Sequence, residues 1–179
     1  MTITDLSGCW EVCLDENKAD ALPTKYPDRI NLPDSTSNAG LGALNTEMEY
    51  GCLTDLHKFE GFAWFRREVE IIPEMSGKNL TLFLERTRKT RVYIDGNQIG
   101  EYCSLCTPHR YDLTGLPAGK HELIIRVDNT DYPTGGGHLT SRDTQTNWNG
   151  IVGRIELQSY SAYPEYVYAI PDPDKKTLH

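Results

Sequence analysis

Short runs of alternating apolar and polar residues, divided by turn signals about every ten residues, constrain the fold of this 179-residue chain most strongly. Successive side chains of a strand point to opposite faces, so each run predicts a strand with one buried face. The runs are residues 8–15, 62–72, 79–86, 91–100, 121–129 and 150–160, and a further strand is expected to begin at Val167. Several short strands at this spacing indicate an all-β fold, either a sandwich or a barrel.

The same alternation predicts which side chains fill the core. In residues 62–72, Trp64, Arg66, Glu68 and Glu70 share one face of the strand, and apolar residues take the other. The residues expected in the core are Phe65, Val69, Ile71, Leu80, Leu82, Leu84, Val92, Ile94, Leu123, Ile125, Val127, Ile151, Ile155 and Leu157.

Turn chemistry and proline content divide the chain further. Asp95-Gly96 suits a tight two-residue turn, so residues 91–100 are predicted to form a hairpin. Residues 15–60 are rich in loops, with at most a turn or two of helix near Gly40–Met48. A loop region of this length in a compact domain is often functional. A domain boundary is expected at Ser159–Pro164, where prolines and aromatic residues replace the alternation.

The charge of the chain argues against two classes of partner. The formal net charge is 18 − 26 = −8. Nucleic acids and anionic membranes select clusters of Lys and Arg, so neither is expected as a partner. No apolar run approaches the roughly 20 residues of a membrane-spanning helix, and no signal peptide is recognisable at the start. The sequence alone leaves the cellular location open.

The five cysteines predict neither a disulfide framework nor a metal centre. Cys9 and Cys13 would lie too far apart along one strand to be bridged. Cys103 and Cys106 have CxxC spacing, but a zinc site needs about four ligands and no second pair follows. We therefore expect free, mostly buried thiols and no metal.

No catalytic machinery is recognisable. Glycoside hydrolysis needs two carboxylates that flank the scissile bond. The paired acids Glu47/Glu49 and Glu68/Glu70 are expected to face solvent instead. The glycines before His138 lack the strand-to-helix context of a phosphate-binding loop. They predict a flexible loop, or one that lets His138 approach a neighbouring domain or a sugar. Neither a catalytic residue nor a cofactor is predicted.

The stretch DTQTNWNGIVGRIEL, residues 143–157, concentrates amides and an indole before a strand. Sugar sites combine planar hydrogen-bonding groups with an aromatic face, so its first half is a candidate contact region. The candidate residues are Asp143, Gln145, Asn147, Trp148 and Asn149, together with His138. Three interpretations stay open, namely direct sugar contact, hydrogen bonding within the loop or to another domain, and a solvated loop.

Several pieces of the chain, taken in order, resemble the N-terminal domain of family 2 glycoside hydrolases, which include β-galactosidases, β-glucuronidases and β-mannosidases. The pieces are Trp64-Phe65-Arg66-Arg67, the hairpin Val92–Gly100, Thr107–Thr114, Ala118–Asn129 and Trp148–Leu157. Each piece alone is weak, but their order is specific. The resemblance covers about Asp5 to Tyr160.

This resemblance implies a jelly-roll β-sandwich of the galactose-binding-domain-like class over residues 1–160. Residues 161–179 would be a linker and the first strand of an immunoglobulin-like domain, with a catalytic barrel beyond it. Both catalytic carboxylates of the family lie in that barrel, so no catalysis is expected from residues 1–179 alone. The implied partners are a β-glycoside, bound together with the barrel, and the downstream domains. Export to the periplasm or the medium is implied only by analogy.

The resemblance also bears on the stretch at 143–157. In some β-galactosidases of the family, an Asp at about the place of Asp143 reaches the active site, which makes a β-galactosidase one possible parent. The second half of the stretch, WNGIVGRIEL, is expected to be the last structural strand of the sandwich. Two alternatives are an autonomous carbohydrate-binding module and a purely structural docking sandwich. The module would need an exposed aromatic platform, for which Trp64, Tyr102, Tyr132 and Trp148 are the candidates.

Overall fold

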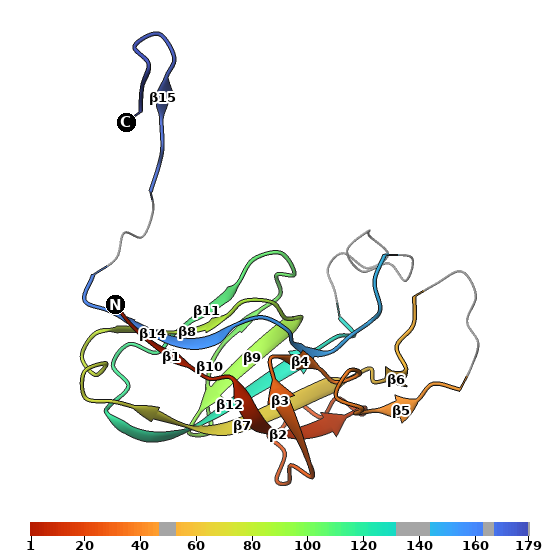
Figure 1. Cartoon of the computed structure of the whole chain (residues 1–179). Coiled ribbons are helices and arrows are strands. Elements are labelled where there is room, and N and C mark those ends of the chain that lie inside the picture. Colours follow the sequence, from red (N-terminus) through yellow and green to blue (C-terminus); the bar gives the residue numbers. More distant parts are fainter. Residues whose placement is uncertain (47–52, 132–143, 163–166, 179) are drawn as a thin grey trace.

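Two antiparallel sheets lie face to face in a computed structural model that describes residues 1–46, 53–131, 144–162 and 167–178 (Figure 1). No helix occurs in these ranges, and the predicted all-β sandwich is confirmed. The six-stranded sheet has the order β10 (Asn97–Tyr102), β9 (Lys89–Ile94), β12 (Gly119–Asp128), β7 (Phe62–Ile71), β2 (Gly8–Asp15) and β3 (Asp28–Leu32). The four-stranded sheet has the order β1 (Thr2–Asp5), β14 (Ile155–Tyr160), β8 (Asn79–Leu84) and β11 (His109–Asp112).

The core lies between the two sheets and consists of the side chains that the alternation predicts. All fourteen predicted core residues belong to one buried apolar cluster. Trp10 extends this cluster and donates a hydrogen bond from its indole Nε1 to the Leu6 carbonyl oxygen over 3.0 Å. Burial of this kind contributes about 25 cal/mol per Å² of apolar surface, which makes the core the main stabilising element of the sandwich.

A second, smaller apolar cluster covers the outer face of the six-stranded sheet. It contains Phe62, Trp64, Tyr93 and Ile124, and Leu22 and Tyr26 from the segment after β2 pack against it. Trp64 is fully buried there, in contrast to the exposed platform position considered above. The alternation placed Trp64 on the correct face, but it could not reveal that residues 16–27 fold back over that face.

The β9–β10 hairpin is confirmed, and its turn is anchored to β12. Asp95 and Gly96 have φ angles of 49° and 78°, as a tight hairpin turn with two positive φ angles requires. One Asp95 carboxylate oxygen accepts a hydrogen bond from the backbone N–H of Glu122 over 2.8 Å. The other lies 2.6 Å from Nδ1 of His121, whose Nε2 lies 2.9 Å from the Pro117 carbonyl oxygen. Both partners of the imidazole are acceptors, so the ring satisfies both only when it is protonated.

This turn predicts a pH dependence of stability. Burial disfavours the charged imidazole, but the bonds to Asp95 and Pro117 outweigh it and raise the pKa of His121 above 6.5. The hydrogen bond from His121 lowers the pKa of Asp95 below 3.8. The contribution of His121 is therefore complete below pH 6.5 and lost as the pH rises through its folded pKa, and that of Asp95 is lost in acid. Urea unfolding should show a larger deficit for His121→Gln at pH 5 than at pH 8, and equal deficits would contradict the charged pair.

The segment 15–60 contains more strand than its sequence suggested. Besides β3, it forms β4 (Asp34–Ser35), β5 (Ala43–Leu44) and β6 (His57–Lys58), with β5 paired to β6. The predicted helical turn near Gly40–Met48 is wrong for the described residues up to Thr46, because Ala43 and Leu44 are in a strand. Residues 47–52, including Glu47 and Glu49, lie outside the described residues.

Two strand predictions near the end of the chain need correction. Residues 150–160 form two strands rather than one, β13 (Gly150–Ile151) and β14, because β13 pairs with β4 before the chain enters the four-stranded sheet. No strand begins at Val167. Instead β15 (Pro171–Asp172) pairs with β16 (Thr177–Leu178) in a small hairpin drawn away from the sandwich (Figure 1).

Four of the five cysteines lie in the described ranges, where their predicted burial can be checked. Cys9, Cys13, Cys103 and Cys106 are free thiols, and Cys13 is partly buried whereas the other three are exposed. The prediction that the thiols are mostly buried is therefore wrong for Cys9, Cys103 and Cys106. A separate expectation concerned membrane-spanning segments. In the described ranges, no helix is long and apolar enough to cross a membrane.

Candidate functional site

The candidate stretch enters the described part of the structure at Thr144 and leads directly into β13. Asp143 and His138 lie outside the described residues, so their predicted sugar contact remains a prediction. Glu68 and Glu70, the acids predicted to face solvent, are exposed on β7. The amide side chains and the indole between Thr144 and Gly150 have three different surroundings: Asn149 is buried, Asn147 is exposed, and Gln145 and Trp148 face a surface hollow.

Asn149 is a buried structural residue. Its side chain is completely buried, and Nδ2 donates to the carbonyl oxygens of Gly61 and Val127, each over 3.2 Å. Its own carbonyl oxygen accepts the backbone N–H of Thr36 over 2.9 Å. Asn149 thereby joins the start of β7, the end of β12 and the turn after β4, which leaves it no side-chain surface for a ligand. Of the three interpretations, hydrogen bonding within the protein describes Asn149.

Asn147 is exposed, and two residues hold it in place, Glu60 through its side chain and Asn129 through its backbone. Its Nδ2 donates to Oε1 of Glu60 over 3.2 Å. Its carbonyl oxygen accepts a hydrogen bond from Nδ2 of the buried Asn129 over 2.9 Å. Asn129 also donates to the Phe59 carbonyl oxygen and accepts from the Gly61 N–H, over 2.8 and 3.0 Å. The sequence analysis did not select Asn129 as a site residue, because in the sequence it is only the polar residue that ends a predicted strand.

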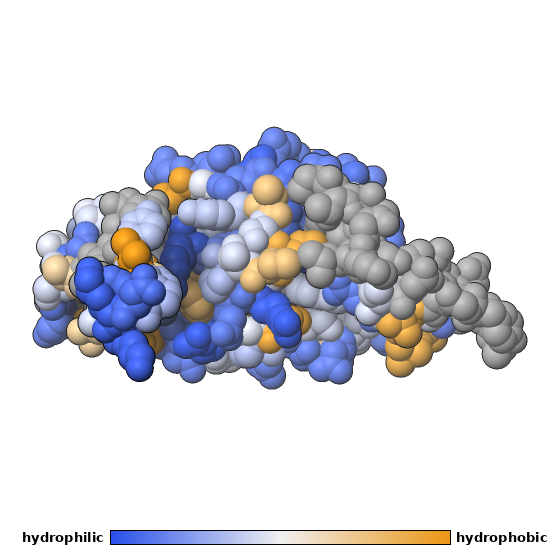
Figure 2. All heavy atoms as spheres, turned by 90° about the horizontal axis from the view of Figure 1, so that it is seen from above, coloured by the Kyte–Doolittle hydropathy of each residue, from blue (hydrophilic) through white to orange (hydrophobic). Residues whose placement is uncertain are grey.

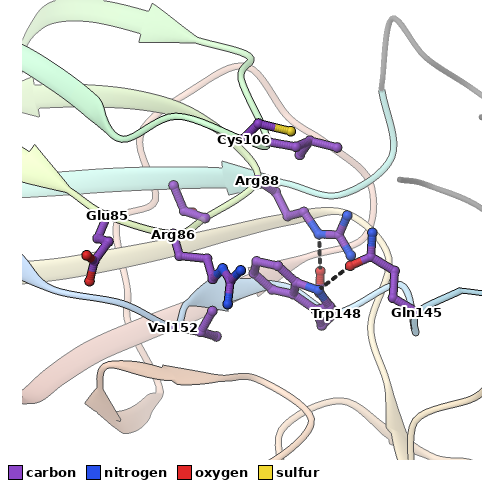
Figure 3. A pocket seen from close by; sticks show the side chains of 9 residues that line it. Glu85, Arg86, Arg88, Cys106, Gln145, Trp148 and Val152 are labelled. Atoms are coloured by element: carbon purple, nitrogen blue, oxygen red, sulfur yellow. Dashed lines mark hydrogen bonds between the residues drawn. The ribbon is translucent and has the colours of Figure 1, made fainter. Parts of the chain in front are cut away.

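Trp148 and Gln145 point toward a hollow instead, and Arg88 holds them there (Figure 3). The indole Nε1 of Trp148 donates to Oε1 of Gln145 over 3.2 Å. The guanidinium carbon of Arg88 lies 4.2 Å from the centroid of the indole ring, a cation–π arrangement. Arg88 also donates to the carbonyl oxygens of Trp148 and Thr146, over 3.1 and 3.0 Å. Because Arg88 is almost fully buried, it fixes the loop and the ring together.

The hollow has a volume of about 500 Å³, the size of a small-molecule site. Besides Trp148, Gln145 and Arg88, it is lined by Glu85, Arg86, Thr87, Leu105, Cys106 and Val152. Glu85 pairs with Arg154 at 3.0 Å, and this hydrogen bond lowers the pKa of the Glu85 carboxyl below its ordinary value. A carboxyl group in that state is a poor proton donor near neutral pH. The hollow therefore presents an indole, an amide and the Arg86 guanidinium, while Arg88 is engaged in holding the loop and the ring.

The molecular face seen from above is mostly hydrophilic, with small separate hydrophobic areas (Figure 2). Tyr102, another platform candidate, is exposed on β10 and stacks on His109 with ring centroids 5.4 Å apart. Tyr132 lies outside the described residues. In the described ranges, no group of three or more His, Cys, Asp or Glu side chains is placed to hold a metal ion.

Comparison with known proteins gives matches to solved structures only. Neither a protein-family profile nor a curated protein matches the sequence. A β-glucuronidase from an uncultured Clostridium superposes with a TM-score of 0.67 and 21% identity, over 96% of this chain and 32% of that one. A Faecalibacterium prausnitzii β-glucuronidase gives 0.66 and 20%, over 95% and 33%. A Ruminococcus gnavus β-glucuronidase in complex with D-glucaro-d-lactam gives 0.64 and 15%, over 87% and 29%.

These likenesses show the fold. The chain is an all-β sandwich of the kind found in those β-glucuronidases, and it spans about a third of their length.

Proposed function

We propose that this chain is the non-catalytic N-terminal sugar-binding-type domain of a family 2 glycoside hydrolase. The observation that carries the proposal is the superposition of nearly the whole chain on about a third of two β-glucuronidases. The ordered motifs from Trp64 to Leu157 support the same family. Residues 161–179 would then be the linker and the first strand of an immunoglobulin-like domain, followed by a barrel that carries both catalytic carboxylates.

The hollow beside Trp148 would be one wall of a carbohydrate site that the barrel completes. The half-buried indole offers an apolar face, and Gln145 offers an amide that can orient hydroxyl groups. Asp143 and His138 would add contacts from the preceding loop. Asn147 and Asn149 would hold the loop in place, since both are engaged in protein hydrogen bonds.

For the sugar itself, a β-glucuronide is the first candidate. Arg86 lines the hollow, and its guanidinium group suits a sugar carboxylate. Three solved structures that share the fold are named β-glucuronidases. A β-galactoside is the second candidate, favoured by the place of Asp143 before the WNGI motif. In either case the parent would hydrolyse an O-glycosidic bond with retention of configuration through two carboxylates about 5–5.5 Å apart.

The test is an assay of the chain expressed together with the segment encoded downstream of it. We expect hydrolysis of p-nitrophenyl β-glucuronide by the longer protein and none by residues 1–179. Trp148→Ala in the longer protein should raise KM roughly 3- to 10-fold with a smaller effect on kcat, because a binding wall is lost. Tyr102→Ala, an exposed aromatic residue outside the hollow, is the matched control.

The same assay distinguishes the alternatives. Hydrolysis of p-nitrophenyl β-galactoside in place of the glucuronide would favour the second sugar. An unchanged KM for Trp148→Ala would remove the hollow from the substrate site and favour a purely structural docking role. Tight oligosaccharide binding by residues 1–179 alone, measured by calorimetry, would instead favour an autonomous carbohydrate-binding module.

A further inference from the structure

Two arginines face each other directly on the outer face of the six-stranded sheet. Arg91 on β9 and Arg126 on β12 are cross-strand partners, and their neighbours Val92 and Val127 point into the core. Like charges in such opposed positions destabilise a sheet unless an anion lies between them. This pair of guanidinium groups, which we call the arginine pair, borders a second hollow that shares no lining residue with the Trp148 hollow.

Arg126 is the buried member of the arginine pair. Its side chain is only 4% exposed, and its guanidinium carbon lies 4.1 Å from the centroid of the Phe62 ring. A charge this deeply buried needs a close counter-charge. Its Nη2 lies 3.5 Å from Glu101, and its Nε has no hydrogen-bond partner among the described residues.

Asp20 supplies the anion between the two arginines. One of its oxygens, Oδ1, accepts from Nη1 of Arg91 over 2.6 Å and from Nη1 of Arg126 over 2.8 Å. The Asp20 side chain is 67% exposed and is carried by the segment after β2 rather than by the sheet. Asp20 is the exposed half of this pair, whereas Arg126 is buried and needs a counter-charge, so the group that replaces the Asp20 carboxylate must itself be an anion.

Two other acids, Glu101 and Asp128, lie near the arginine pair. Glu101 binds the opposite edge of Arg91, with Oε2 at 2.8 Å from Nε and 2.7 Å from Nη2. Asp128 is buried and accepts the backbone N–H and the hydroxyl of Thr130 through Oδ1. Glu101 thus also contacts both arginines, with Oε2 2.7 Å from Nη2 of Arg91 and 3.5 Å from Nη2 of Arg126. Asp20 is the more exposed of the two acids, at 67% against 32%.

A hollow of about 550 Å³ opens beside the arginine pair. Its ionisable lining residues are Lys18, Lys89, Arg91, Arg126, Asp20, Asp128 and Asp131, four cations against three acids. Glu101 contacts Lys89, Arg91 and Arg126 from outside this lining, so displacement of Asp20 would leave a local charge of 4 − 3 = +1 in a chain whose net charge is −8. The volume suits a molecule of the size of one sugar ring.

We propose that the arginine pair is a binding site for a carboxylate-bearing small ligand, such as a sugar acid, and that Asp20 is a tethered competitor for it. The donors already hold a carboxylate oxygen at hydrogen-bond distance from both arginines, so a carboxylate is the group that they fit. The proposal is independent of the function assigned to the Trp148 hollow.

The test is a titration of residues 1–179 with sodium glucuronate at constant ionic strength, followed through the Nε–H signals of the arginines by NMR. We expect saturable shifts at Arg91 and Arg126. Asp20→Asn, which removes the competitor's charge, should bind roughly two- to five-fold more tightly. Arg91→Gln should weaken binding at least about ten-fold. Arg91 is preferred to the buried Arg126 as the test position because its loss threatens the fold less.

Arg29→Gln is the matched control, because Arg29 is an exposed arginine on β3 outside the hollow, and it should leave the affinity unchanged. Glucose, which has the same ring without the carboxylate, should give no shift. The proposal is overturned if neither the wild-type chain nor Asp20→Asn gives a saturable shift, if Asp20→Asn binds no more tightly, or if glucose moves the same signals.

Discussion

Gly150→Ala is expected to lower the free energy of unfolding by about 3–5 kcal/mol, a large part of the roughly 5–15 kcal/mol that stabilises a domain. Gly150 has a φ angle of 128°, which residues with a Cβ atom rarely adopt. A Cβ atom at this position would lie 2.5 Å from the Asp34 carbonyl oxygen and 3.0 Å from Cα of Ser35. Both are backbone atoms of β4, so neither can turn aside.

The effect is measured by urea unfolding, with Gly119→Ala as the matched control. Gly119 has a φ angle of 136°, but no atom lies within 4 Å of the place of its Cβ. Its substitution should therefore cost only the backbone strain, about 1–3 kcal/mol. Equal losses for the two variants would mean that the contact between β13 and β4 does not constrain Gly150.

Asn129→Ala is expected to lower the free energy of unfolding by about 2–4 kcal/mol and the melting temperature by about 5–15 °C. The substitution leaves three buried or partly buried backbone groups without their partner, namely the Gly61 N–H and the carbonyl oxygens of Phe59 and Asn147. An unsatisfied buried polar group costs more than the hydrogen bond itself contributes, so these losses add to a large effect.

Calorimetric melting checks this value, with Asn31→Ala as the control. Asn31 is exposed on β3, and its substitution should change stability by about 0.5 kcal/mol or less. A melting temperature of Asn129→Ala close to that of the control would show that water replaces the lost bonds. The position of the loop at Asn147 would then not depend on its hydrogen bond to Asn129.

The sequence predicted the core because each core residue obeys a local rule. Leu80, Leu82 and Leu84 alternate along one strand, and this alternation alone determines which face of the strand is buried. The Asp95-Gly96 turn was equally local, since two positive φ angles select that residue pair.

What the sequence could not predict depends on contacts between distant segments. The strands β3 and β4 are short and lie among prolines, so they exist only because β2 and β13 pair with them. The burial of Trp64 depends on Leu22 and Tyr26, which lie some forty residues away in the chain. In the candidate site, chemistry indicated the right stretch. Only the fold separates Asn149, which is buried, from Trp148, which borders the hollow.

The pairing of β1 with β14 also determines when the sandwich can form. Thr2 is the register partner of Ser159, and β14 is the strand that joins β1 to β8 in the four-stranded sheet. At a synthesis rate of about 5–20 residues per second, roughly 10–30 s therefore pass between the synthesis of β1 and that of its partner β14. Until then β8 lacks one of its two partners, and its leucines lie beside an open strand edge. The nascent chain is thus most prone to misassociation just before residue 160 emerges, when a chaperone would have most to protect.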